Sequence, residues 1–343
     1  MAIQILLGDL DGKVLAELTA DVGPVSWQLN KPGKMKLTLP KPIPFKIGYR
    51  ILVRFDNGLP DWGGTVELPW TETPGTIEAT CLGIENALLY RRTRKNRNFY
   101  SAPVGAIFQA VILEAQTYQS LGINLGHIWN GGGSHSPRYH FKPVLDVLQK
   151  SVCTMEACDF AFIPKLAGGK ITFTGELYFQ RGVDKTSSVV LLEDHLNDVV
   201  MKWNGPLVNN FAAVGNGSTW GDERQVSIQE DSASVNEYGL REDSGAYTGV
   251  TYSTTLETHA KTILKQRAFP SRKVSFDAAN LAPSSFSSYD IGDIVRLSLP
   301  SFDYDASVRL LAREFDPGTG KCALVVEEPT ESVPTSVPDE DVE

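Results

Sequence analysis

Hydrophobic and polar residues alternate through most of the first ninety residues, and the alternation returns after about residue 198. Alternation over short runs is typical of strands that bury one face of a sheet. Turn-forming pairs such as Pro32-Gly33 and Pro74-Gly75 separate the runs. Pro32-Gly33 suits a type II turn, because proline sets φ at the first central position and glycine accepts a positive φ at the second. The pattern predicts antiparallel β-structure towards both ends of the chain.

The spacing of apolar residues changes between residues 99 and 160. Ile107 and Val111 belong to a series spaced four apart, which predicts a helix with Ser101 as a candidate N-cap. The stretch "YHFKPVLDVLQKSV" predicts a second helix. A third helix is predicted in "TTLETHAKTILKQRA", which opens with a capping box that begins at Thr254. The middle of the chain is therefore expected to mix helices with strands.

One strand pattern occurs twice. "FKIGYRILVRF", residues 45–55, and "YDIGDIVRLSL", residues 289–299, match in residue type when aligned on Gly48 and Gly292. Each copy is followed by a strand, a Pro-Gly turn and another strand. The duplication favours two related β-modules flanking an α+β insertion. The alternative is a chance likeness, since short strand patterns are degenerate.

The charge balance restricts the classes of partner. The chain carries 32 basic and 41 acidic residues, a net charge of −9, which argues against a nucleic-acid groove. No apolar run is long enough to span a membrane, and Asp9 follows the start too soon for a signal peptide. We expect folding in a cytoplasm. The four cysteines are too few for a disulfide framework, and we expect Cys81 and Cys322 to be buried free thiols.

Several motifs, in one order, carry a family resemblance. "WQLNKPGKMKLTLP" fits the pattern W-x-L-x-x-P-G-x-x-x-L-x-L-P, and it is followed by "GGTVELPW", "GIENALLYRRTR" and "FKPVLDVL". Further on come "VGNG", "YGLRE" and "YDIGDIVRL". Each motif is weak, but their shared order, over residues 1 to about 328, resembles the tail-tip or baseplate hub proteins of long-tailed bacteriophages, the siphophage-type minor tail proteins.

The resemblance implies a fold. It is mainly β with an α+β insertion, and two related β-barrel domains of the tail-tube type flank the mixed α/β domain. The domains expected from it are a first barrel at 1–95, the insertion at 96–197, and a second barrel at 198–224 and 271–328. A further insertion with a helix is expected at 225–270. An acidic, extended tail at 329–343 completes the chain, since its prolines and acids cannot bury much apolar area.

The resemblance also implies a role. Three chains with two barrels each would form a pseudo-six-fold ring that joins the tail tube to a three-fold tip. The implied partners are the chain itself as a homotrimer, distal tail and tail tube proteins, a tape measure protein, and a tip fibre or spike protein. DNA would pass through the lumen during genome ejection. The implied location is the virion tail tip, after assembly in the host cytoplasm, and the implied class is structural and non-enzymatic.

We weighed a metal site and assign none. A zinc site could in principle draw its ligands from His135, His140, Cys153 and Cys158, but their spacing does not fit the usual ligand pairs. A loop histidine pair beside two small buried residues is the simpler interpretation. "GHIWNGGGSHS" lacks both the phosphate-loop and the dinucleotide-binding patterns and is interpreted as a flexible loop, so we assign no cofactor.

Two alternative functions remain open. A tail-associated cell-wall hydrolase, a peptidase or glycosidase, could use paired acids, but the candidates lie in a polar stretch typical of a solvated surface, so we assign no catalytic residue. These candidates are Glu230, Asp231, Glu237, Glu242 and Asp243. A receptor-binding or carbohydrate-binding tail module would instead use exposed aromatic residues such as Trp129 or Trp220.

The chain has one basic cluster. It comprises Arg91, Arg92, Arg94, Lys95 and Arg97. It could contact DNA or an acidic face of a neighbouring subunit. A solvated linker between the first barrel and the insertion explains it equally well.

Overall fold

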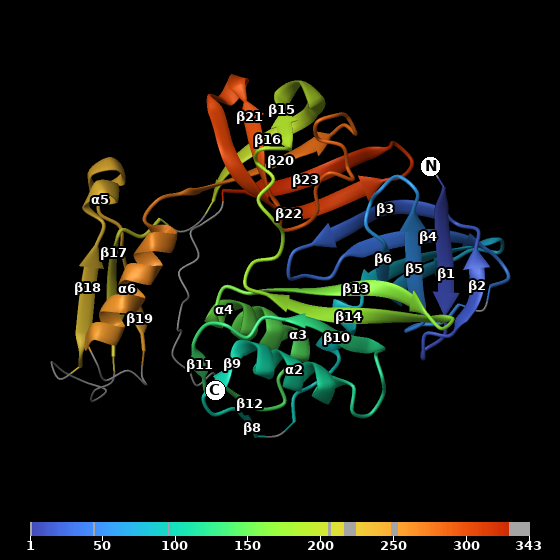
Figure 1. Ribbon diagram of the computed structural model, residues 1–343, viewed down its shortest axis with the longest axis horizontal. Helices are drawn as coiled ribbons and strands as arrows, with labels where there is room; N and C mark the ends of the chain where they lie inside the picture. Colours follow the sequence, from blue (N-terminus) through green and yellow to red (C-terminus); the bar gives the residue numbers. More distant parts are fainter. Residues whose placement is uncertain are drawn as a thin grey trace.

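The computed structural model describes residues 2–43, 45–94, 96–204, 207–215, 224–247 and 253–328. This part of the chain is mainly β, as the alternation predicted, and most strands belong to one 13-stranded sheet. Figure 1 shows the sheet crossing the upper part of the molecule, with the helical segments below it and to one side. No helix in the described ranges is long and apolar enough to cross a membrane.

The first part of the large sheet is built from the first 83 residues. Its strand order is β2-β1-β5-β6-β7-β4-β3, and every neighbouring pair is antiparallel. The alternating pattern buries one face, which includes Met35, Leu37 and Leu39. The strands are β1 (Ile3–Gly8), β2 (Val14–Leu18), β3 (Asp21–Gln28), β4 (Lys34–Pro40), β5 (Arg50–Phe55), β6 (Trp62–Glu72) and β7 (Thr76–Gly83).

The second part of the sheet uses the other end of the described chain. Its order is β16-β20-β23-β22-β21, and β15 pairs in parallel with β21. Short 3-10 turns at Glu193–His195 and Pro300–Phe302 flank these strands. The strands are β15 (Val190–Leu192), β16 (Leu196–Asn204), β20 (Ser271–Ala278), β21 (Ile294–Leu299), β22 (Tyr304–Asp316) and β23 (Lys321–Glu327).

The two parts share one connectivity. In the first, β3 pairs with β4, β5 to β7 form a meander, and β7 returns to β4. In the second, β16 pairs with β20, β21 to β23 form a meander, and β23 returns to β20. Gly48 and Gly292 precede the two meanders, both with positive φ. The repeated sequence pattern therefore marks two five-strand units with the same antiparallel pairing.

The two five-strand units are continuous in space. β3 of the first unit pairs antiparallel with β22 of the second, with Val25 opposite Phe315. The pairings of the described strands form one branched, open sheet, so closure into two barrels stays a prediction.

The mixed α/β segment packs beneath the first unit. Its sheet has the order β10-β14-β13, and β13 and β14 lie between the large sheet and the helices (Figure 1). Its core includes Phe108 and Phe173 together with Leu6 and Leu52 of the large sheet. The elements are α1 (Glu85–Leu89), β8 (Arg97–Asn98), β9 (Ala102–Pro103), α2 (Val104–Ala115), β10 (Ile123–Ile128), β11 (Ser134–His135), β12 (Arg138–Tyr139), α3 (Val144–Val147), a π-helical turn (Leu148–Val152), α4 (Cys153–Met155), β13 (Asp159–Ala167) and β14 (Lys170–Tyr178).

A smaller unit projects from the second part of the sheet (Figure 1). Its strands have the order β18-β17-β19, and α6 covers one face through a separate core that includes Phe211 and Leu256. We call it the outlying unit, residues 207–267. Its elements are β17 (Asn210–Val214), β18 (Val226–Glu230), α5 (Ser232–Tyr238), β19 (Glu242–Ala246) and α6 (Ser253–Arg267).

Two local predictions are wrong. The chain turns at Asn30, which has φ of 57°, whereas Gly33 has no positive φ and so is not the centre of a type II turn. Helix α2 has Pro103 rather than Ser101 at its N-cap position, and the Ser101 N–H donates to Ser136 Oγ at 3.0 Å. The third predicted helix is present as α6, but the side chain of Thr254 lies outside the described residues.

Candidate functional site

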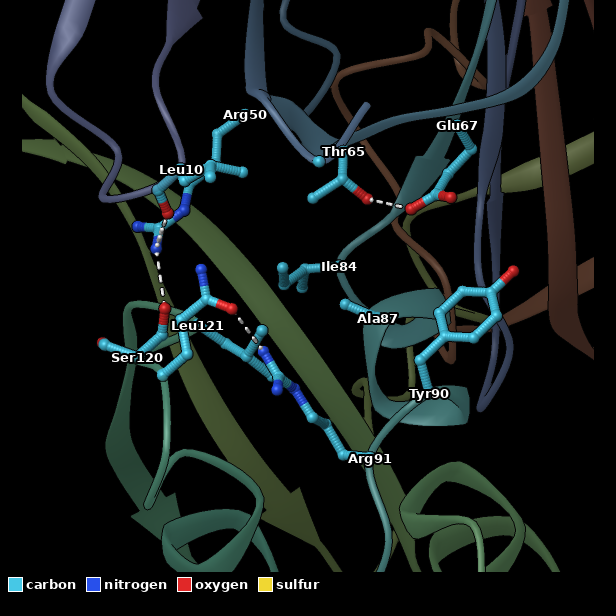
Figure 2. Close-up of a pocket in the computed structure, with 12 residues that line it drawn as sticks. Leu10, Arg50, Thr65, Glu67, Ile84, Ala87, Tyr90, Arg91, Ser120 and Leu121 are labelled. Atoms are coloured by element: carbon cyan, nitrogen blue, oxygen red, sulfur yellow. Dashed lines mark hydrogen bonds between the residues drawn. The ribbon is translucent and has the colours of Figure 1, made fainter. Parts of the chain in front are cut away.

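A cavity of about 290 Å³ lies where the first five-strand unit meets the mixed α/β segment (Figure 2). The turn after β1, the start of β5, helix α1 and the segment that follows α2 all contribute to its wall. Figure 2 shows Arg50 on one side of the cavity, with Tyr90 and Arg91 on the other. The cavity therefore marks the junction between two segments that are far apart in the sequence.

Arg50 holds this junction together. It is the first residue of β5, only 2% exposed, and its guanidinium donates to the carbonyls of Ile171 and Leu10, both at 2.9 Å, and of Ser120 at 3.2 Å. Burial lowers the pKa of Arg50, while the carboxylates of Asp11 and Asp9 oppose that change. An arginine keeps its charge in proteins, so these carbonyls supply the stabilisation that water would otherwise give.

The backbone makes room for the guanidinium. Gly122 has φ of 70°, and a Cβ there would lie 2.2 Å from the Arg50 Nη1 atom. The donors of Arg50 point to carbonyls within the chain, so Arg50 positions segments rather than presenting a free charge to a ligand. This role could not be inferred from the sequence, where Arg50 is simply the first residue of a strand pattern.

Exposed aromatic and basic side chains lie beside the cavity. Tyr90 is 69% exposed, Tyr118 is 93% exposed and Phe141 is 56% exposed. We define the tyrosine–arginine surface by its residues, which are Leu89, Tyr90, Arg91, Arg92, Arg94, Tyr118 and Phe141. Three different segments of the chain contribute to it, at 89–94, 118 and 141.

Hydrogen bonds hold the three segments of this surface next to one another. The Arg91 guanidinium donates to Gln119 Oε1 at 3.2 Å, which brings the segment around Tyr118 close. The Thr93 N–H donates to the Lys142 carbonyl at 2.9 Å, which brings the segment around Phe141 close. The tyrosine–arginine surface is therefore contiguous, and it extends the cavity wall at Tyr90 and Arg91 outward.

The predicted basic cluster is divided by the fold. Arg91, Arg92 and Arg94 belong to the tyrosine–arginine surface. Arg97 instead pairs with Glu114 at 3.3 Å, and its guanidinium lies 4.9 Å from the centre of the Phe99 ring. Lys95 lies outside the described residues. Among the described members of the cluster, Arg91, Arg92 and Arg94 remain available to a partner.

A second buried charge joins three parts of the chain. Asp159, at the start of β13, is 4% exposed and accepts from Asn30 Nδ2 and from the Arg181 N–H, both at 2.8 Å. It also forms an ion pair with Arg309 of β22. The Arg309 Nε donates in turn to the carbonyl of Gly292 at 3.2 Å. Both five-strand units and the mixed α/β segment are therefore tied together at Asp159.

The zinc candidates do not converge. His135 Nε2 lies 2.6 Å from Glu156 Oε1, and the same oxygen accepts from the Gly133 N–H at 2.7 Å. Within the described residues, no group of three or more His, Cys, Asp and Glu side chains is placed to hold a metal ion. The cysteines are free thiols, and Cys81 and Cys322 are buried as predicted. Burial raises the pKa of Cys322 to about 12.

The acidic candidates lie towards one end of the outlying unit, where Glu230 and Glu242 are both paired with Asn210, and several have structural roles. Asp231 caps α5 by accepting from the Ser234 N–H at 2.9 Å, and Asp243 pairs with Arg267 at 3.4 Å. Trp129, a candidate for carbohydrate binding, is half-buried, with its ring 5.1 Å from that of Phe179. Trp220 lies outside the described residues. None of the described candidates lines the cavity at the junction described above.

The fold is similar to those of solved phage tail proteins. A tail protein of 43 kDa from prophage MuSo2 of Shewanella oneidensis gives a TM-score of 0.65 at 11% identity, covering 96% of this chain and 99% of that chain. The tail protein from Neisseria meningitidis MC58 gives 0.64 at 12% identity, covering 98% and 100%. A chain of the p2 virion baseplate in its activated conformation gives 0.52 at 10% identity, covering 95% and 99%.

No protein-family model matches the sequence, and no curated protein matches it significantly. The likeness is therefore one of structure at low sequence identity, and it extends over nearly the whole chain. It confirms, at the level of the fold, the resemblance that the order of sequence motifs indicated. This chain has the fold of the phage tail and baseplate proteins.

Proposed function

We propose that this chain is a structural, non-enzymatic protein of a phage virion, a homotrimeric hub at the tail tip or baseplate. The observation that carries the proposal is the pair of five-strand units with identical connectivity. Three chains would supply six such units, which matches a six-fold ring on one face and a three-fold tip on the other. The similarity to tail and baseplate structures supports the same role.

In the proposed hub, different segments of the chain occupy different places in the assembly. Residues 1–95 form the first barrel of the ring, and 198–204 with 271–328 form the second. The boundary expected at 224 moves because β17 (Asn210–Val214) pairs with β18 and β19 of the outlying unit. The segments 96–197 and 207–270 lie outside the ring, and 329–343 follows the second barrel in the sequence. Tail tube and distal tail proteins bind one face of the ring, and a fibre or spike protein binds the other. The tape measure protein and then the DNA occupy the lumen, where a neutral or acidic surface lets DNA slide without sticking.

Oligomer mass tests the proposal directly. Native mass spectrometry of the purified chain should give three times the mass of the 37.6 kDa chain. In a density map of an assembled tail tip, a rotation of about 60° around the tail axis should superpose the two five-strand units. A chain that remains monomeric at all concentrations and does not enter a six-fold ring would exclude the hub. Cleavage of purified cell walls by the chain would favour the hydrolase instead.

A further inference from the structure

The tyrosine–arginine surface carries positive charge that the folded chain does not neutralise. Among the residues that the structure describes, no ion pair involves Arg91, Arg92 or Arg94. Their side chains contact uncharged acceptors instead, such as Gln119 Oε1 and Thr117 Oγ1.

The composition of this surface is typical of a protein-binding site. Tyrosine and arginine are the residues most enriched in the energetically important parts of protein interfaces. Tyr118 is 93% exposed and Tyr90 is 69% exposed, which a chain acting alone has no evident reason to maintain. The wall of the adjoining cavity is mixed: Leu121 and Ile84 are apolar, whereas Arg50 and Glu67 are charged, so the cavity offers apolar contacts beside the arginines. The surface therefore fits a segment that is acidic and also carries small apolar side chains.

Residues 329–343 have this composition. The segment "PTESVPTSVPDEDVE" contains five acidic residues and no basic residue, together with three valines and three prolines. Prolines restrict an extended chain before it binds, so less conformational entropy is lost on docking. Fifteen extended residues span up to about 50 Å, which is enough to cross a domain of this size or to reach a neighbouring copy.

We propose that residues 329–343 bind the tyrosine–arginine surface. The acidic run at 339–343 pairs with Arg91, Arg92 and Arg94, while the valine and proline side chains lie against Tyr90 and Tyr118 and reach into the cavity. This contact does not depend on the tail-tip role. It gives the basic cluster a partner within the same polypeptide species, in place of DNA.

A peptide titration tests the contact in the full chain. The tail acids are first neutralised (Glu331→Gln, Asp339→Asn, Glu340→Gln, Asp341→Asn and Glu343→Gln), so that the tail of the protein does not compete. A fluorescent peptide of sequence 329–343 is then added, and its anisotropy is recorded. We expect saturable binding that weakens about tenfold between 0.1 M and 0.5 M salt, because the attraction is between exposed charges.

Matched charge reversals locate the binding site. On the same background, Arg91→Glu, Arg92→Glu and Arg94→Glu together should weaken binding at least tenfold. The control reverses three exposed lysines elsewhere, Lys31, Lys34 and Lys165, and should change the affinity by less than about twofold. Equal losses in the two triple variants, or no binding at all by the peptide, would overturn the proposal.

A second readout does not depend on folding of the arginine variant. Amide hydrogen exchange compares the natural chain with the chain whose tail acids are neutralised, since these changes lie outside the described fold. Exchange at 89–94 and 117–119 should become faster in the neutralised chain, and exchange in β22 should stay the same. Unchanged exchange at both segments would contradict the contact. A single-stranded oligonucleotide that binds the surface while the peptide does not would assign it to nucleic acid instead.

Discussion

At the scale of single residues, the structure depends on buried polar groups whose partners lie far away in the sequence. Arg50 bonds to carbonyls in the β1–β2 turn and the mixed α/β segment, and Asp159 bonds to Asn30 and Arg309. A buried charge that loses its partners, or a buried carbonyl that loses its donor, costs more than a missing apolar contact. These residues should therefore dominate the response of the fold to substitution.

The Arg50→Met variant tests whether Arg50 stabilises the fold by joining these segments. The change removes three hydrogen bonds and leaves carbonyls without donors, so we expect the free energy of unfolding to fall by about 2–5 kcal/mol. Urea denaturation followed by circular dichroism measures it. Arg54→Met is the control on the same strand, because Arg54 is 39% exposed and forms only a surface ion pair, worth less than about 1 kcal/mol. Equal losses in the two variants would refute the bridging role of Arg50.

The buried Glu85 side chain should make the stability of the fold depend on pH. Burial raises the pKa of Glu85 to about 7, against the opposing effects of a backbone hydrogen bond and of Arg181. The folded chain therefore holds a proton that the unfolded chain releases near pH 4.5. Binding of this proton stabilises the folded chain. The stabilisation is complete below the unfolded pKa and is lost as the pH rises through the folded pKa of about 7. Glu85→Gln, which cannot ionise, should gain stability relative to the natural chain between pH 5 and pH 8.

The measurement is a pair of urea midpoints at each pH. The Glu85→Gln variant should resemble the natural chain at pH 5 and exceed it at pH 8. Glu78→Gln serves as the control, because Glu78 is 51% exposed and forms a surface ion pair with Lys36. A difference between Glu85→Gln and the natural chain that stays constant from pH 5 to pH 8 would contradict this account.

At the scale of elements, sequence patterns predicted correctly those strands and turns whose conformation depends on neighbouring residues in the chain. Alternation predicted strands with one buried face, and β4 has such a face, formed by Met35, Leu37 and Leu39. β13 and β14 likewise form a hairpin across the two glycines that follow Ala167. The turn after β3 was mispredicted because distant residues decide it. Asn30 takes the left-handed conformation there, and its side chain bonds to Asp159 and to the N–H of Phe160.

Two substitutions at Asn30 distinguish the contribution of its backbone conformation from that of its side-chain hydrogen bonds. Asn30→Gly keeps the positive φ but loses the side-chain bonds, so unfolding should become easier by about 1–3 kcal/mol. Asn30→Ala loses the bonds and also strains the backbone, adding about 1 kcal/mol more. Thermal and urea unfolding of both variants measure the two terms. An Asn30→Gly variant as stable as the natural chain would show that the contacts of Asn30 contribute nothing.

The site itself was only partly predictable, again for a physical reason. The arginines at 91–94 were visible as a basic cluster, but Tyr118 and Phe141 come from other segments, and only the folded chain places them beside Tyr90. Likewise, nothing in the pattern "RILVRF" distinguishes the buried Arg50 from the more exposed Arg54. Spacing along a strand gives the face on which a residue lies, whereas its partners depend on tertiary packing.

At the scale of the whole molecule, the duplication explains where the outlying unit is inserted. In the first unit, β3 and β4 are joined by a short turn around Asn30. Their counterparts β16 and β20 pair in the same way, with Asn204 opposite Ser271, but the outlying unit connects them. The outlying unit has its own core, whereas the mixed α/β segment shares a core with Leu6 and Leu52 of the large sheet. The two insertions should therefore differ in how far the rest of the fold depends on them.

Replacing residues 205–270 by a two-residue Asn-Gly turn tests this difference. The ends to be joined already face each other as hairpin partners, and Asn-Gly favours the turn that such a hairpin needs. The shortened chain should remain folded, unfold in one cooperative transition and keep the oligomer mass of the full chain, because the ring contacts would come from the five-strand units. Replacing 104–155 should instead give an unfolded product, since it removes much of the core shared with the first unit. If the chain in which 205–270 is replaced aggregates or becomes monomeric, the outlying unit is part of the ring.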